Sequence, residues 1–120
     1  MSKIMIIDDE KEATGLLERI LKLEGYESIS VNDSTTAAQI ASVSNPDIIL
    51  LDLMMPEIDG FRLCRMLRAD PKFANTPVII ISALSDNKSK VDALGAGAND
   101  YLTKPYQLHE LVSMIKKFDQ

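Results

Sequence analysis

Three short segments of the chain are apolar at every position: Ile4–Ile7, Ile48–Leu51 and Val78–Ile81. A strand with one face in water alternates apolar and polar residues, whereas a strand that is buried on both faces is apolar throughout. Sheets of the second kind are mostly parallel, because the helices that connect parallel strands cover both faces. The three segments therefore predict an α/β fold in which helices flank a buried parallel sheet.

The stretches between these segments have helical spacing and helix-end signals. The first helix is expected over Glu10–Glu24, with Gly25 as its stop signal. Its apolar face would consist of Ala13, Leu16, Leu17 and Ile20. Two further strands are expected at Glu27–Val31 and Asp100–Thr103. The remaining helices are expected to be one that ends near Ser44, one that follows Gly60, one from Asp86 to about Leu94 and one at Gln107–Lys117. This alternation predicts a doubly wound sheet with right-handed crossovers.

Length and composition limit the classes of protein that the chain can belong to. Its 120 residues fit one domain over 1–120, and we expect no second domain. The net charge of -5 argues against direct nucleic-acid binding. No apolar run approaches the roughly 20 residues that span a bilayer, so no membrane association is expected. With Cys64 as the single cysteine and no secretory signal, the cytoplasm is the expected compartment.

The strand ends carry the chemistry, because ligands of open α/β sheets bind outside the carboxyl ends of the strands. Four strand ends could share one crevice, with Asp8 and Asp9 after the first strand, Asp52 after the third, Ser82 after the fourth and Lys104 after the fifth. Asn32 and Asp33 follow the second strand and should lie far from this crevice if that strand is at the sheet edge.

Three neighbouring carboxylates repel one another unless a cation lies between them. Oxygen ligands suit Mg²⁺, with Mn²⁺ as the alternative ion, whereas one histidine (His109) and one cysteine provide no zinc site. An aspartate beside such an ion can attack phosphorus and form an acyl phosphate. Lys104 and the ion would stabilise the phosphoryl oxygens, and Ser82 could donate a hydrogen bond to one of them.

Each of these residues, taken alone, also has a structural interpretation. An aspartate after a strand is commonly a helix cap or turn residue, and Ser82 alone could be the same. Lys104 alone could be a surface charge, and Tyr101 a half-buried strand aromatic. We favour function because the structural interpretation requires four separate coincidences at four strand ends. We interpret Cys64 and His109 as structural.

Four motifs, in this order and at this spacing, resemble the response-regulator receiver family of two-component signalling, in particular the chemotaxis regulators. They are Asp8-Asp9, the segment LDLMMP at 51–56 followed by Asp59-Gly60, Ser82-Ala83, and the segment ALGAGANDYLTKP at 93–105. The similarity extends over essentially the whole chain. It implies a flavodoxin-like (βα)5 fold whose five strands have the order 2-1-3-4-5.

The resemblance also implies a role for each acidic residue. Asp52 would accept a phosphoryl group from a sensor histidine kinase or a histidine phosphotransfer protein. Asp9, Asp52 and the backbone carbonyl of Met54 would bind Mg²⁺ directly, and Asp8 would act mainly through water. The kinase would dock on the start of the first helix, at about Glu10–Leu17, and on the adjacent loop at 105–106.

Signal output is implied for the other residues. Lys104 would pair with the phosphoryl group, Ser82 would close onto it and Tyr101 would swing inward. The Lys104-Pro105 bond would be cis. The change would reach an unknown effector protein or domain through the fourth helix, the fifth strand and the fifth helix, in a monomer or a phosphorylation-dependent homodimer. Met54 and Leu84 are apolar where the family tunes hydrolysis, so we hypothesise a slowly decaying phosphoryl group and no turnover of an external substrate.

Three alternatives have specific sequence tests. A haloacid-dehalogenase-like phosphatase carries a second aspartate two residues after its nucleophile, where this chain has Met54. A flavin-binding protein of the same fold needs a Ser/Thr/Gly-rich loop after the first strand, where Asp8 and Asp9 stand. A receiver that serves only for docking without phosphorylation would have lost some of the acidic residues or the lysine, and this chain retains them.

Overall fold

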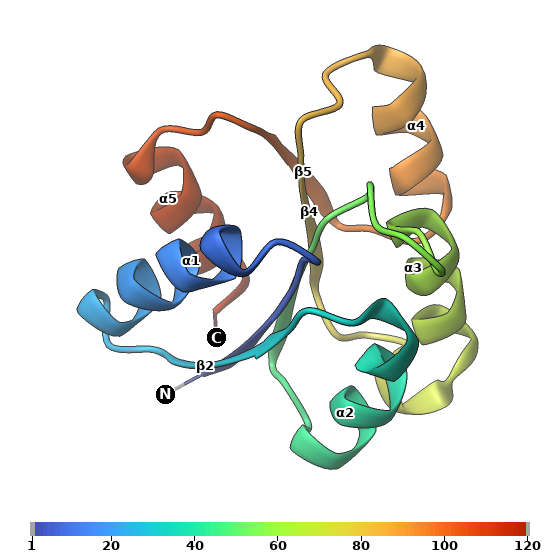
Figure 1. Ribbon diagram of the computed structural model, residues 1–120, viewed down its shortest axis with the longest axis horizontal. Coiled ribbons are helices and arrows are strands. Elements are labelled where there is room, and N and C mark those ends of the chain that lie inside the picture. The colour runs from blue at the N-terminus through green and yellow to red at the C-terminus, as the bar shows by residue number, and fades with distance from the viewer. Residues whose placement is uncertain (1, 120) are drawn as a thin grey trace.

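A parallel β-sheet forms the centre of the computed structural model, which describes residues 2–119 (Figure 1). Within that range the sheet has five strands in the order β2-β1-β3-β4-β5, and each neighbouring pair is parallel. The strands are β1 (Lys3–Ile7), β2 (Glu27–Val31), β3 (Ile48–Leu51), β4 (Val78–Ser82) and β5 (Asp100–Thr103). The predicted fold class and strand order are confirmed.

The helices cover both faces of the sheet. They are α1 (Lys11–Leu23), α2 (Ala37–Ser44), α3 (Gly60–Ala69), α4 (Asn87–Gly95) and α5 (Leu108–Phe118), with short 3-10 turns η1 (Ser34–Thr36) and η2 (Pro71–Phe73). Helices α1 and α5 lie on one face, and α2, α3 and α4 lie on the other (Figure 1). Within residues 2–119, no helix combines the length and the apolar character needed to cross a bilayer.

The apolar strands separate two cores. Ile4 and Ile6 of β1 pack with the buried residues of α1 and α5, whereas Met5 and Ile7 pack with those of α2, α3 and α4. All four side chains are fully buried. This burial on both faces is the reason that the segment Ile4–Ile7 of the strand has no polar position, and it confirms the inference from the continuous apolar runs. Cys64 is buried in the second of these cores, as expected.

The buried face of α1 differs from the predicted one. Leu16 was placed in the core, but its side chain is 45% exposed, and the residues of this helix that are buried are Thr14, Leu17 and Leu21. Their spacing of three and four residues is also helical, so the periodicity alone could not choose between the two rotations of the helix. The rotation in the structure leaves Leu16 at the surface.

Candidate functional site

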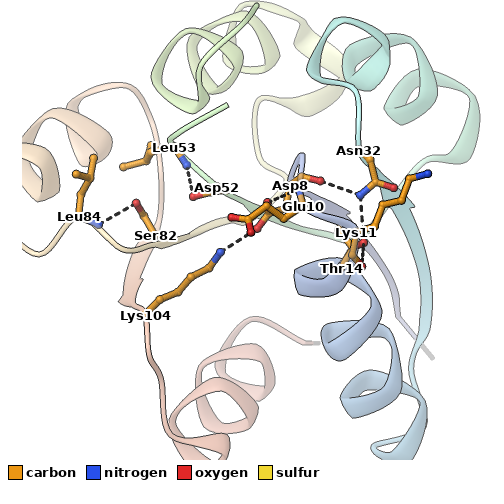
Figure 2. A network of polar contacts seen from close by, with 10 residues as sticks. All are labelled: Asp8, Glu10, Lys11, Thr14, Asn32, Asp52, Leu53, Ser82, Leu84 and Lys104. Atoms are coloured by element: carbon orange, nitrogen blue, oxygen red, sulfur yellow. Dashed lines mark hydrogen bonds and ion pairs between the residues drawn. The ribbon is translucent and has the colours of Figure 1, made fainter. Parts of the chain in front are cut away.

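The carboxyl ends of four strands meet at one edge of the sheet, as the sequence predicted (Figure 2). Asp8 follows β1, Asp52 follows β3, Ser82 ends β4 and Lys104 follows β5. One carboxylate oxygen from each of Asp8, Asp9 and Asp52 lies within 4.8 Å of the others. The structure therefore brings the predicted acidic residues into a single cluster, with the lysine beside it.

Asp52 is an almost fully buried carboxylate, with 7% of its surface exposed. Its backbone N–H donates to the carbonyl of Ile7 at 2.9 Å, and its Oδ1 accepts from the N–H of Leu53 at 2.8 Å. Burial and the negative charge of Asp8 raise the pKa of Asp52 to about 6, against the opposing attraction of Lys104. The ionised form of Asp52 is thus destabilised, which is the condition that a bound cation would relieve.

Asp8 and Lys104 form an ion pair at this edge. The Nζ of Lys104 lies 2.9 Å from Oδ2 of Asp8, whose other oxygen accepts from the N–H of Glu10 at 3.0 Å. Burial disfavours the charge on Lys104, but the hydrogen bond to Asp8 and the nearby carboxylates outweigh burial and raise the pKa of the ammonium group. The peptide bond between Lys104 and Pro105 is cis, as the resemblance implied.

Ser82 and Tyr101 are connected through one residue, Leu84. The buried Oγ of Ser82 accepts from the N–H of Leu84 at 3.2 Å, and the hydroxyl of Tyr101 donates to the carbonyl of Leu84 at 2.6 Å. Burial raises the pKa of the Tyr101 hydroxyl above its ordinary value. A movement of the Ser82 hydroxyl would therefore disturb the residue that holds Tyr101.

The loop between β3 and α3 carries Asp52 and Met54, and Gly60 sets its closure. The N–H of Gly60 donates to the carbonyl of Leu53 at 2.9 Å, and Asp59 caps the helix. A Cβ atom on Gly60 would lie 2.2 Å from the carbonyl oxygen of Asp52. The start of α3 can therefore approach the acidic cluster this closely only because residue 60 has no side chain. Met54 lies in the same loop with 61% of its surface exposed.

The expectation that Asn32 lies far from the crevice is wrong. Its Nδ2 donates to the backbone carbonyl of Asp8 at 2.9 Å and to Oγ1 of Thr14 at 3.1 Å (Figure 2). Strand β2 is at the edge, but its neighbour is β1, and Ile7 pairs with Val31. The next residues of the two strands, Asp8 and Asn32, are therefore side by side. The strand order together with this register could have indicated that Asp8 and Asn32 are neighbours, but not the hydrogen bond between them.

The donor set fits a hard divalent cation. The clustered side chains offer carboxylate oxygens, which are preferred ligands of Mg²⁺, and Asp9 is the exposed member of the cluster. His109 lies on α5 with an exposed side chain and is separate from the cluster. The chemistry of the site is therefore that of an acidic oxygen pocket with one ammonium group.

Comparison with known protein families gives one match over nearly the whole chain: the family model of the response regulator receiver domain matches residues 4–116. The chain belongs to the response-regulator receiver family. The receiver is similar to the DNA-binding dual master transcriptional regulator RpaA of Synechocystis sp., with 36% identity over 116 residues that cover 97% of this chain and 48% of that protein. It is also similar to the response regulator PleD of Caulobacter vibrioides, with 43% identity over 104 residues, 87% of this chain and 23% of that protein.

A solved structure supports the same membership. The signal receiver domain of a signal transduction histidine kinase from Syntrophus aciditrophicus has a TM-score of 0.90 and 36% identity, and the match covers 98% of this chain and 89% of that chain. The receiver described here spans less than half the length of the RpaA and PleD proteins. It is a receiver domain of two-component signalling, a class of signalling domain.

Proposed function

We propose that this receiver is a phosphorylation-operated switch in which Asp52 accepts a phosphoryl group from the phosphohistidine of a sensor histidine kinase or a phosphotransfer protein. The observation that most supports this proposal is the position of the Asp52 carboxylate. It is buried, it has an oxygen within 4.8 Å of oxygens of Asp8 and Asp9, and it lies beside Lys104. In this position the nucleophile has Lys104 beside it, and a divalent cation held by the carboxylates would add the positive charge that phosphate needs.

The transfer needs no general base, because an ionised carboxylate is already a nucleophile. A lone pair of an Asp52 oxygen forms the new O–P bond while the N–P bond of the protonated phosphohistidine breaks. The electron pair of the broken bond stays on the ring nitrogen, which leaves a neutral imidazole. Lys104 can pair with the transferred group, and the Ser82 hydroxyl can donate a hydrogen bond to it. An Mg²⁺ ion, or Mn²⁺ in its place, would supply positive charge that offsets the charges of the carboxylates and the phosphoryl group.

The residues that would hold the ion come from two loops. Asp9, Asp52 and the backbone carbonyl of Met54 would bind it directly, and Asp8 would act mainly through water. Support comes from the short distances within the carboxylate cluster and from the exposure of Asp9. Because Asp8 already pairs with Lys104 at 2.9 Å, its charge is partly compensated without an ion.

A groove beside the site supports the expected docking surface for the kinase or phosphotransfer protein. A cavity of about 720 Å³ lies between α1 and the loop at Pro105 and Tyr106, and Lys104 is part of its lining. Leu16, which the rotation of α1 leaves exposed, is part of the lining. A partner helix in this groove could present a phosphohistidine to Asp52.

Output would run from the phosphoryl group to the α4-β5-α5 face. Ser82 can leave the N–H of Leu84 to reach the phosphoryl group, and the carbonyl of Leu84 is the acceptor of Tyr101. Leu84 lies three residues before α4 begins at Asn87. A shift of Leu84 would therefore release or re-aim the hydroxyl of Tyr101. A downstream effector that binds one of the two arrangements better would read the change.

Two apolar side chains support a slow loss of the phosphoryl group. Met54 and Leu84 offer no oxygen or nitrogen atom in their side chains that could orient an attacking water. The same feature disfavours the phosphatase alternative, because that reaction needs an acid at the position of Met54. The receiver would then hold its signal without turning over an external substrate.

Intact mass spectrometry tests the proposal. The purified protein is incubated with phosphoramidate and Mg²⁺, and one added phosphoryl group is expected. Labelling should disappear in Asp52→Asn and in EDTA, and it should persist in the control Asp59→Asn, which changes a carboxylate of the same loop but keeps a good helix cap. Labelling that survives Asp52→Asn, or that needs no metal ion, would contradict the mechanism.

A further inference from the structure

The segment 32–34, directly after the edge strand β2, contacts both loops that carry the proposed metal ligands. Asn32 donates to the backbone of the β1-α1 loop at Asp8, with 2.9 Å between the atoms. Ser34 donates to the backbone of the β3-α3 loop at the carbonyl of Pro56, also at 2.9 Å. Neither side chain belongs to the acidic cluster itself.

The contact at Asn32 fixes the peptide that joins Asp8 to Asp9. The carbonyl that accepts from Asn32 is part of that peptide group, so the hydrogen bond orients the peptide plane that leads into Asp9. The second amide hydrogen of Asn32 goes to Oγ1 of Thr14, which is buried in the first turn of α1 and donates in turn to the carbonyl of Lys11 (Figure 2). The exposed Asp9 carboxylate is thus positioned through its backbone.

The contact at Ser34 supports an unusual turn in the other loop, which is also closed by a backbone hydrogen bond from the N–H of Ile58 to the carbonyl of Pro56 at 2.8 Å. The buried Oγ of Ser34 also accepts from the N–H of Ile58 at 3.2 Å, so the hydroxyl bridges the two residues on either side of Glu57. Glu57 has a φ of 68°, a left-handed conformation that is unfavourable for a residue with a side chain. Such a conformation persists when the surroundings hold it. The same loop carries Met54, whose carbonyl is a proposed ligand.

The two contacts come from one short, locally fixed segment. Between them, Oδ1 of Asp33 accepts from the N–H of Thr35 at 3.0 Å and from its Oγ1 at 2.6 Å, which caps η1. Because this cap fixes the turn, the distance between Asn32 and Ser34 is fixed as well. The segment therefore connects the two loops as one rigid piece.

We propose that residues 32–34 are positioning residues that act as a brace. The brace holds the β1-α1 and β3-α3 loops at the separation at which Asp9, Asp52 and the Met54 carbonyl can bind the same divalent cation. This inference rests on the proposed metal site. It extends that site to residues that make no contact with the ion and that follow a strand outside the crevice.

Titration with MgCl₂, followed by the ¹H–¹⁵N NMR shifts of the backbone amides, measures the relevant affinity without any phosphoryl transfer. Asn32→Ala and Ser34→Ala should each bind Mg²⁺ about tenfold more weakly than the wild type, as is typical for residues that orient metal ligands. The double variant should bind no more weakly than the weaker single variant, because one broken contact already frees the brace. Ser34→Thr keeps the hydroxyl and should retain most of the affinity.

Two control variants remove similar hydrogen bonds elsewhere. Ser44→Ala deletes a hydroxyl that donates to the carbonyl of Ile40 at 2.8 Å, at the far end of α2. Asn99→Ala deletes an amide oxygen that accepts from the N–H of Val78 at 2.8 Å, at the opposite end of the strands. Both should bind Mg²⁺ like the wild type. Urea unfolding of every variant checks that each is folded during the titration. If Ser34→Ala does not fold, the Mg²⁺ affinity of Asn32→Ala alone tests the brace.

The outcomes separate the brace from the proposed function. Wild-type affinity in Asn32→Ala and Ser34→Ala, equal losses in the two controls, or losses that add in the double variant would each overturn the brace and leave the metal site standing. A wild-type protein whose amides near Asp9 and Asp52 do not respond to MgCl₂ would overturn the proposed metal site, and the brace with it.

Discussion

Replacing Asp52 with asparagine should increase the free energy of unfolding of the metal-free protein at neutral pH. Asp52 is 7% exposed and lies beside the buried carboxylate of Asp8, so its negative charge is unfavourable in the folded state. Asparagine has nearly the same shape, and its side-chain oxygen can still accept the 2.8 Å hydrogen bond from the N–H of Leu53. The substitution therefore removes the charge and keeps the local packing.

The magnitude follows from the pKa of Asp52, which burial and the charge of Asp8 raise from 3.8 to about 6. Below about pH 3 the carboxyl is almost entirely neutral in the folded and the unfolded protein, so its charge costs almost nothing. As the pH rises from there to about 6, the unfolded state ionises first, and stability is lost progressively. The difference between pKa values of 3.8 and about 6 corresponds to about 3 kcal/mol at pH 7, which is the expected upper gain in Asp52→Asn.

Urea unfolding followed by far-UV circular dichroism in EDTA measures this gain. The matched control is Asp47→Asn, which changes the net charge equally at an exposed carboxylate that accepts from the N–H of Lys3 at 2.8 Å. We expect a much smaller effect in the control and convergence of wild type and Asp52→Asn at about pH 3. Adding Mg²⁺ should stabilise the wild type more than the variant. If Asp52→Asn is no more stable than the wild type in EDTA at pH 7, the electrostatic reasoning is wrong.

Three further substitutions test individual contacts. Gly60→Ala should lower the free energy of unfolding, measured with urea, by about 2 kcal/mol, because the new methyl group would lie 2.2 Å from the carbonyl oxygen of Asp52. An unchanged free energy of unfolding would show that the loop can move aside. Met54→Asn should speed the loss of the phosphoryl group severalfold in a mass-spectrometric time course, since it can orient a water, and an unaltered decay would argue against that role. Tyr101→Phe removes the hydrogen bond to Leu84 and should lower the free energy of unfolding by about 1 kcal/mol. Labelling by phosphoramidate should stay unchanged, and a loss of labelling would place the hydroxyl in the transfer step.

The sheet could be predicted from the sequence because burial on both faces leaves a direct compositional signal. The segment Ile48–Leu51 has the same bounds in the structure, and the other apolar runs differ from their strands by one residue at an end. Helix rotation was harder. Leu16 and Leu21 both fit the helical period of α1, and the packing against the sheet, which the sequence does not report, decides which of them is buried.

The acidic cluster was predictable for a related reason, since the topology of a parallel sheet brings its carboxyl ends together. The contacts that support the cluster were not. Asn32 and Ser34 donate to backbone carbonyl groups, which every residue has, so no pattern of residue types marks the acceptor. The turn at Glu57 depends on a left-handed residue without the glycine that would have signalled it. Only the loop geometry shows these contacts.

Metal affinity and instability at this site are two consequences of one repulsion. Burial and the proximity of Asp8 raise the pKa of Asp52, and the same proximity of carboxylates is the source of attraction for a divalent cation. Asp52→Asn should therefore gain stability and lose metal affinity together. Asn32→Ala should lose metal affinity without gaining stability, because it leaves the charges in place and changes only where they are held. Measuring both quantities for the two variants thus distinguishes the electrostatic contribution to the site from the positional one.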